Sequence, residues 1–228
     1  IAATAASQGF TVLKLKCNDS DDIVGIAKAV RDSTPEGFRL IFDPNERWND
    51  RRTALPIIRS LETIGNVMFV EDPLPRWDLS AVADLRRQVD IPVALHIALG
   101  YAEHGQRKQD VMTSFRESAS DAYNLSGCTA DFLDMAASAE IQGIPYWRGS
   151  EVDLGVMEAG YLHSLAVTLG AQLPSDVFGR LIREHDLLTE PLKVTEGHMS
   201  VPTAPGLGVE LDQAALEHYA VANPVTIR

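Results

Sequence analysis

Two lysines close an apolar run near the start of the chain, in the sequence Lys14-Leu15-Lys16. In an extended strand, residues two apart share one face, so both ammonium groups point into the same space. Crowding them lowers the pKa of at least one, and a lysine with a lowered pKa can act as a general base. The alternative is that both are ordinary surface lysines, because this spacing is common.

Carboxylates close the next two apolar runs. Asp43-Pro44-Asn45 follows the second run, and Glu71-Asp72-Pro73 begins 28 residues after Asp43. Acids in this arrangement suit a hard divalent cation, which prefers oxygen ligands. Helix capping by Asp43 and Asp72 in the loops that follow is the alternative interpretation.

The elements that must position these residues recur along the chain, as apolar runs that each precede a helical pattern. The runs end in polar residues spaced 27, 28, 25, 28 and 24 residues apart. These ends are Lys16, Asp43, Glu71, His96, Asn124 and Arg148. Near-continuous apolar strands are typical of parallel strands covered on both faces, and barrels of strand–helix units need about 31 residues per unit or fewer. We therefore predict an α/β fold, a (β/α) barrel with strands near 10–15, 39–42, 67–70, 91–95, 122–125 and 144–147. A doubly wound sheet is disfavoured because the turn at 17–19 has no glycine.

Composition narrows the possible partners. The 228 residues carry a formal net charge of −12, which opposes binding to nucleic acid or to an anionic membrane. No apolar run approaches the roughly 20 residues that span a bilayer. Two cysteines are too few for a disulfide framework, and we expect reduced thiols in a cytoplasmic protein. We expect one domain, 1–228, in which a proline-rich segment at about 172–228 wraps the end of the barrel.

With these residues in place, the chain resembles the mandelate racemase/muconate lactonizing group of the enolase superfamily. The Lys14-Leu15-Lys16 strand resembles its Lys-x-Lys strand, and Asp43-Pro44-Asn45 and Glu71-Asp72-Pro73-Leu74-Pro75 resemble two metal-ligand strands. Ile91-Pro92-Val93 resembles the lead into the next strand, and Gly149-Ser150 through Gly155, with Leu162-His163, a later strand and its helix. Pro205-Gly206-Leu207-Gly208-Val209 resembles the closing segment.

The resemblance implies the chemistry. Members abstract the proton α to a carboxylate, and Mg²⁺ stabilises the resulting enediolate. Carried over, Lys16 is the base, and Lys14 assists it and helps to bind the carboxylate. Asp43 and Glu71 are metal ligands, and Asn45 supports them or contacts the substrate. Asp153 falls where the family has a glutamate near the substrate carboxylate.

Three positions depart from the family pattern. His96 stands where the family has its third acidic metal ligand, which favours Mn²⁺ or Zn²⁺ over Mg²⁺ if it is a ligand. Otherwise the metal site is weak, or His96 is an acid/base group, a substrate contact or a packed strand-end histidine without function. Asn124 and Arg148 stand on the strands that carry the family's opposite-face base. We expect both to contact the substrate, with Arg148 clamping an anionic or polyol group.

The resemblance also implies an N-terminal capping domain and a first barrel strand, and neither is visible in this sequence. We therefore expect a truncated barrel. Because barrels of this family often form symmetric oligomers, we also expect a homo-oligomer. The predicted function is a metal-dependent lyase or isomerase acting on a small hydroxy-carboxylate, and with one clear base we favour dehydration of a sugar acid. Two alternatives stay open. One is a degenerate barrel that binds a small molecule without metal. The other is a racemase or cycloisomerase with His96 as the second base.

Overall fold

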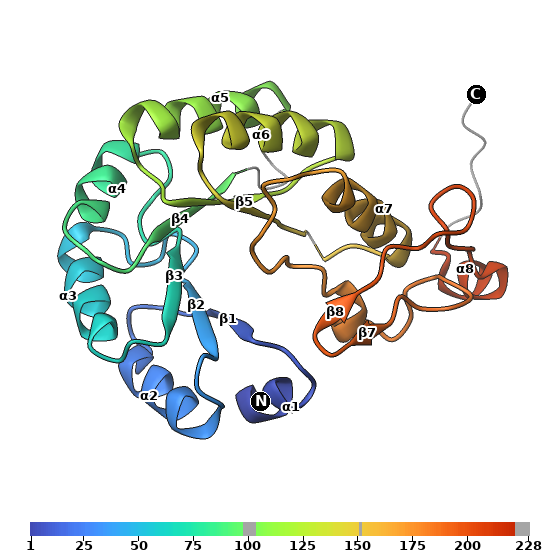
Figure 1. Cartoon of the computed structure of the whole chain (residues 1–228), viewed down its shortest axis with the longest axis horizontal. Coiled ribbons are helices and arrows are strands. Elements are labelled where there is room, and N and C mark those ends of the chain that lie inside the picture. Colours follow the sequence, from blue (N-terminus) through green and yellow to red (C-terminus); the bar gives the residue numbers. More distant parts are fainter. Residues whose placement is uncertain (98–103, 151, 222–228) are drawn as a thin grey trace.

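A computed structural model describes residues 1–97, 104–150 and 152–221, with the side chains of 104–108 left out of the description. Six parallel strands pair in chain order, from β1 to β6. They are β1 (Val12–Lys16), β2 (Arg39–Asp43), β3 (Val67–Glu71), β4 (Val93–Ile97), β5 (Ala122–Leu125) and β6 (Tyr146–Arg148). Figure 1 shows them curving as an arc inside a layer of helices. Parallel strands in chain order with helices outside confirm the predicted barrel-type fold.

The helices alternate with the strands as the spacing predicts. They are α1 (Ala2–Ser7), α2 (Ile23–Ser33), α3 (Arg51–Glu62), α4 (Leu79–Arg86), α5 (His104–Glu117), α6 (Thr129–Gln142) and α7 (Gly155–Ala166). Asp22, Asp50 and Asp78 each accept a hydrogen bond from the first turn of a helix. These three residues cap α2, α3 and α4, which leaves Asp43 and Asp72 available for other contacts.

The fourth strand lies later than predicted. We expected it at 91–95, and it runs from Val93 to Ile97. Pro92 has no N–H to give to the ladder, although its carbonyl accepts from Val70 N over 3.0 Å. The shift places His96 inside the strand instead of after it.

After α7 the chain leaves the repeat. Residues 173–178 run beside β6, where Asp176 N donates to the carbonyl of Arg148 over 2.8 Å. The remaining elements are η1 (Gly179–Ile182), the hairpin of β7 (Val194–Thr195) and β8 (His198–Met199), and α8 (Gln213–Tyr219). The hairpin turn meets the chain before β1, because a methyl group on Gly197 would lie 2.6 Å from the carbonyl of Gly9. The C-terminal part thus contacts the first strand region, beside the gap in the arc (Figure 1).

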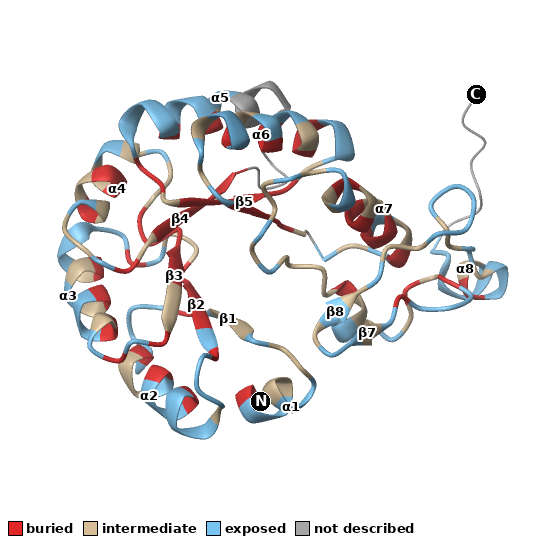
Figure 2. Ribbon diagram, in the orientation of Figure 1, coloured by how far each residue is buried: buried red, intermediate tan, exposed pale blue. Residues whose placement is uncertain are grey.

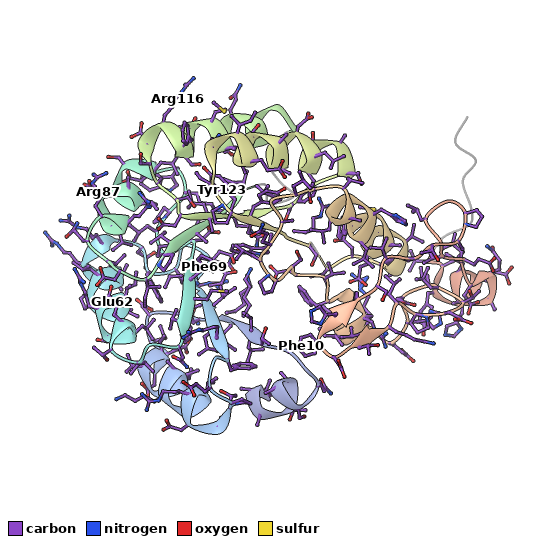
Figure 3. The ribbon with its side chains drawn as sticks, in the orientation of Figure 1. Phe10, Glu62, Phe69, Arg87, Arg116 and Tyr123 are labelled. Carbon is purple, nitrogen blue, oxygen red and sulfur yellow. The ribbon has the colours of Figure 1, made fainter. Side chains whose placement is uncertain are left out.

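Two apolar layers hold the sheet. Outward-facing residues such as Leu40 and Phe42 pack under the helices in the main core. The inner face carries a smaller cluster of Ile41, Phe69, Ala94, Ala122 and Trp147. Figure 2 shows the buried residues along the strands and the helix faces that cover them, and Figure 3 shows Phe69 on the inner side and Arg87 projecting outward. The inner cluster forms the floor beneath the polar strand ends.

None of the helices described in the three ranges above is long and apolar enough to cross a membrane.

Candidate active site

The ends of β1, β2 and β3 bring the two lysines and two carboxylates together. Lys14 Nζ lies 3.1 Å from Asp43 Oδ2 and 2.7 Å from Glu71 Oε2. Lys16 Nζ donates to the same Asp43 oxygen and to Asn45 Oδ1, the latter over 2.7 Å. Both carboxylates are fully buried, whereas the Lys16 side chain is 59% exposed. The strand register aligns Lys16 with Asp43 and so produces their contact.

Neighbouring carboxylates determine the charge state of Lys14. Burial works against its ammonium group, but Glu71, Asp176 and Asp43 outweigh burial and raise the pKa of Lys14 above its usual range. Burial likewise opposes ionisation of Asp43, yet Lys14 and Lys16 hold the pKa of Asp43 below its ordinary value. Crowding with Lys16 therefore does not lower the pKa of Lys14, because three carboxylates surround it.

Glu71, Asp72 and His96 form a buried acid–histidine cluster whose ligand atoms all lie within 4.8 Å of one another. Burial, reinforced by neighbouring carboxylates, raises the pKa of Glu71 to about 8 and that of Asp72 to about 7. Burial, together with Lys14 and Arg76, lowers the pKa of His96 to about 3, so its imidazole is neutral. A neutral imidazole beside two carboxylates is a donor set for a cation.

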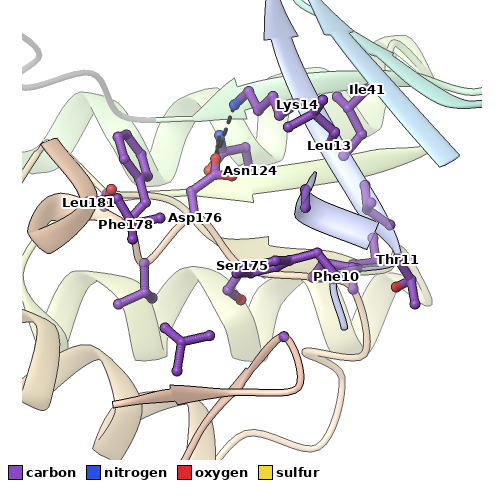
Figure 4. Close-up of a pocket in the computed structure, with 18 of the residues that line it drawn as sticks. Phe10, Thr11, Leu13, Lys14, Ile41, Asn124, Ser175, Asp176, Phe178 and Leu181 are labelled. Atoms are coloured by element: carbon purple, nitrogen blue, oxygen red, sulfur yellow. Dashed lines mark hydrogen bonds and ion pairs between the residues drawn. The ribbon is translucent and has the colours of Figure 1, made fainter. Parts of the chain in front are cut away.

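Asn124 connects this cluster to the last part of the barrel. Its Nδ2 donates to Glu71 Oε1 over 2.8 Å, and Asp176 Oδ2 lies 3.4 Å from the same nitrogen. Lys14 also reaches Asp176, over 3.0 Å, and Figure 4 shows these three side chains meeting. Asn124 therefore holds a buried carboxylate, a contact that competes with its expected one to a substrate.

Asp176 is a site residue that the sequence interpretation missed. It lies 28 residues after Arg148, within the spacing of the earlier strand ends, but no apolar run precedes it. Its side chain is 19% exposed and also accepts a hydrogen bond from Trp147 Nε1 over 3.3 Å. Asp176 is thus a third carboxylate around Lys14.

Arg148 and Asp153 lie elsewhere. Neither occurs among the described residues that line the cavity at the strand ends. The Arg148 guanidinium packs on Tyr161, 3.8 Å from the ring centre, and on Phe132. Asp153 Oδ2 accepts from Tyr161 over 2.6 Å. Strand register explains the position of Arg148. Trp147, not Arg148, pairs with Asn124 and faces the inside of the barrel.

The cavity itself has a volume of about 1590 Å³. It opens beside β1, and its polar wall includes Lys14, Lys16, Asn45, His96, Asn124 and Asp176. Apolar side chains form the rest of the cavity wall, among them Phe10, Leu13, Phe178 and Leu181 (Figure 4). The space accommodates a small molecule with one polar and one apolar side.

Comparison with known proteins decides the family. A sequence model of the Enolase C-terminal domain-like family matches residues 1–215. The chain belongs to the enolase superfamily, in its mandelate racemase/muconate lactonizing group. This confirms the resemblance read from the strand ends.

The chain is similar to isomerases of this superfamily. It is 30% identical over 205 residues to muconate cycloisomerase 1 of Rhodococcus opacus, covering 88% of this chain and 52% of that protein. It is 31% identical over 219 residues to N-succinylamino acid racemase of Thermus thermophilus, covering 94% and 56%. The crystal structure of N-succinyl Arg/Lys racemase from Bacillus cereus matches with a TM-score of 0.84 at 23% identity, covering 97% of this chain and 58% of that one. The chain thus spans little more than half of these relatives.

The strand-end residues fit the divalent cation that the superfamily resemblance implies. Nδ1 of His96 is buried and, within the described part of the chain, has no hydrogen-bond partner. It faces Glu71 Oε1 at 3.8 Å. Two ligands of one metal ion lie about 3–3.5 Å apart, so this pair is close to that spacing. Asp43, the other predicted ligand, is engaged by both lysines.

Proposed function

We propose that this protein is a divalent-cation-assisted isomerase or lyase that removes the proton α to the carboxylate of a small substrate, with Lys16 as the base. The observation that carries the proposal is the position of Lys16. Its exposed side-chain nitrogen, which is neutral when it accepts a proton, lies in the cavity beside a buried carboxylate. The family's Lys-x-Lys strand and the isomerase activities named for its relatives support it.

Each site residue then has a chemical task. Asp43 accepts from Lys16 and fixes the direction of its Nζ. Asn45 accepts from the same nitrogen and turns it toward the cavity. Lys14, which stays charged between Glu71 and Asp176, attracts the substrate carboxylate.

The cation belongs at Glu71 and His96, whose facing atoms lie 3.8 Å apart. When bound, it supplies positive charge to the oxygen atoms on which negative charge develops as the α-proton leaves. The site for the cation is formed by the chain's own residues, because the imidazole of His96 and the carboxyl groups of Glu71 and Asp72 are buried together.

Two candidate functions, isomerisation and dehydration, differ in the step that follows proton removal. The relatives are a cycloisomerase and a racemase, which favours isomerisation of a related carboxylate such as a muconate or an N-succinylamino acid. Asn124 favours the second candidate, dehydration of a hydroxy acid, because its amide cannot serve as an opposite-face base and elimination needs only Lys16.

Hydrogen–deuterium exchange at the substrate α-carbon tests the shared first step. The purified protein is incubated in D₂O with a divalent cation and a panel of muconolactones, N-succinylamino acids and sugar acids, and exchange is followed by proton NMR. We expect exchange, and a loss of at least about 100-fold in Lys16→Ala, because general-base catalysis contributes about 10²–10⁴-fold.

Lys28→Ala is the matched control, since Lys28 is an exposed lysine on α2. It should exchange at the unaltered rate. Exchange that survives in Lys16→Ala would overturn the assignment of the base. Substrate binding without exchange and without any need for a cation would instead identify a binding protein.

A further inference from the structure

We infer that His96 is a metal ligand through Nδ1, in a tautomer that Ser126 fixes, and that the ligand set is Glu71, Asp72 and His96, which selects a cation of the Zn²⁺ type over Mg²⁺. The inference rests on the proposed function, because it specifies the cation of that same site. It assigns a ligand, Asp72, and a positioning residue, Ser126, that the sequence interpretation did not.

The imidazole of His96 is held on one side by β5. Its Nε2 lies 2.8 Å from Ser126 Oγ, and both residues are almost fully buried, at 6% and 1% exposed. The β4–β5 register places His96 beside Asn124, two residues before Ser126. Since the ring is fixed at Nε2, Nδ1 is directed toward Glu71 Oε1, 3.8 Å away.

The two tautomers have different consequences at Nδ1. A proton on Nδ1 would be a buried donor without a hydrogen bond, because 3.8 Å is too long for one. A proton on Nε2 donates to Ser126 Oγ and leaves a lone pair on Nδ1, which faces a carboxylate oxygen. A cation bound between the Nδ1 lone pair and the carboxylate oxygen satisfies both.

Asp72 completes the ligand set because hydrogen bonds tie both its backbone and its side chain to β4, the strand that carries His96. Its φ of +46° turns the side chain out of the ordinary strand direction. Oδ1 accepts from His96 N over 2.9 Å, which ties Asp72 to the residue that bears the imidazole. Oδ2 has no hydrogen-bond partner within the described ranges, although Arg76 Nε lies 3.5 Å from it.

Asp43 is the weaker candidate for the third ligand. Its Oδ2 contacts both Lys14 and Lys16, and its Oδ1 accepts from Asn45 N over 3.0 Å. A cation at Asp43 would have to displace an ammonium group. At Asp72 a cation meets one ion pair, in which Arg76 Nε lies 3.5 Å from Oδ2. The charges of the cluster thus direct a cation away from β2.

The donor chemistry selects the metal. Mg²⁺ prefers six oxygen ligands in octahedral geometry, whereas imidazole suits Zn²⁺ and its transition-metal neighbours. Zn²⁺ binds both histidine nitrogen and carboxylate oxygen. We therefore expect Zn²⁺ to bind more tightly than Mg²⁺ by well over 10-fold.

Nitrogen NMR of the purified protein, labelled with ¹⁵N-histidine, tests the tautomer and the ligand directly. His96 is assigned as the signal that disappears in His96→Gln. We expect a proton on Nε2 before metal addition, and a change at the Nδ1 signal when Zn²⁺ is added. A proton on Nδ1, or Zn²⁺ binding that leaves both His96 nitrogens unchanged, would overturn the inference.

Titration calorimetry with Zn²⁺ and Mg²⁺ tests the ligand set. Ser126→Ala should weaken Zn²⁺ binding about 10- to 100-fold, the usual cost of losing the group that orients a histidine ligand. Ser164→Ala is its matched control, because Ser164 is a buried serine that donates only to the carbonyl of Tyr161. His96→Asp should reverse the preference toward Mg²⁺, and Asp72→Asn should lose more affinity than Asp43→Asn.

The outcomes separate this inference from the proposed function. If Mg²⁺ binds more tightly than Zn²⁺ and Lys16-dependent exchange persists, the ligand assignment is wrong and the function stands. If no cation binds and exchange is absent, the proposed function fails as well. Equal losses in Ser126→Ala and Ser164→Ala would show that Ser126 acts only through folding.

Discussion

Gly149 lies against the two side chains that hold the acid–histidine cluster in place. A methyl group there would overlap Asn124 Oδ1 and Ser126 Oγ. Asn124 donates to Glu71, and Ser126 contacts His96. The absence of a side chain at Gly149 is therefore a condition for both contacts.

Gly149→Ala should destabilise the protein by about 1–3 kcal/mol, the usual cost of adding a methyl group where there is no room for it. It should also weaken cation binding, because Asn124 and Ser126 must move. Denaturant unfolding and calorimetry measure the two effects. Gly160→Ala is the matched control, since nothing lies within 4 Å of a methyl group there, and it should cost nothing. Equal unfolding midpoints for both variants would contradict the argument.

At the scale of elements, helix α7 buries the carboxyl group of Glu158. Glu158 Oε1 accepts from Gly179 N, and Oε2 has no hydrogen-bond partner in the described part of the chain. Burial, with Asp186 and Asp153 nearby, raises the pKa of Glu158 above its ordinary value. A raised carboxyl pKa means that folding favours the protonated form, so its contribution is complete at low pH and is lost as pH rises.

Glu158→Gln should therefore become more stable than the unaltered protein as pH rises above about 4.5, the ordinary carboxyl value. The gain should reach on the order of 1 kcal/mol and level off above the folded-state pKa, because the amide keeps the acceptor for Gly179. Urea unfolding across this range measures it. The exposed Glu184→Gln corrects for the loss of one negative charge. A gain that shrinks with rising pH would contradict the sign.

The elements also show how far the sequence leads. Spacing predicted all six strands, because a parallel barrel needs an apolar run and a covering helix in every unit. It did not predict Asp176, since Gln172-Leu173-Pro174-Ser175 is not an apolar run. It placed Arg148 at the cavity because a strand end does not reveal which neighbour faces inward. Register decides that, and it selects Trp147. The Ser126 contact of His96 depends on three-dimensional pairing and has no local sequence signal.

At the scale of the whole molecule, the cation should act as a stabilising ligand. An ion that binds only the folded state at 100 times its Kd adds about 2.7 kcal/mol. For a domain of this size that is an increase in Tm of about 5–10 °C. Thermal unfolding with and without Zn²⁺ measures the shift. Glu71→Gln, which removes one ligand at nearly constant volume, should abolish it. An unaltered shift in that variant would place the cation elsewhere.

The pairing of strands in chain order has a consequence for assembly during synthesis. Each strand can join the one made just before it, so the sheet can grow as the chain leaves the ribosome. Lys14, Asp43 and Glu71 then meet early, while Asp176 reaches Lys14 across 162 residues. That contact closes a long loop and needs residue 176 to have been made. A half-made chain thus has the lysines and two acids but lacks the part of the cavity wall that residues 172–199 contribute.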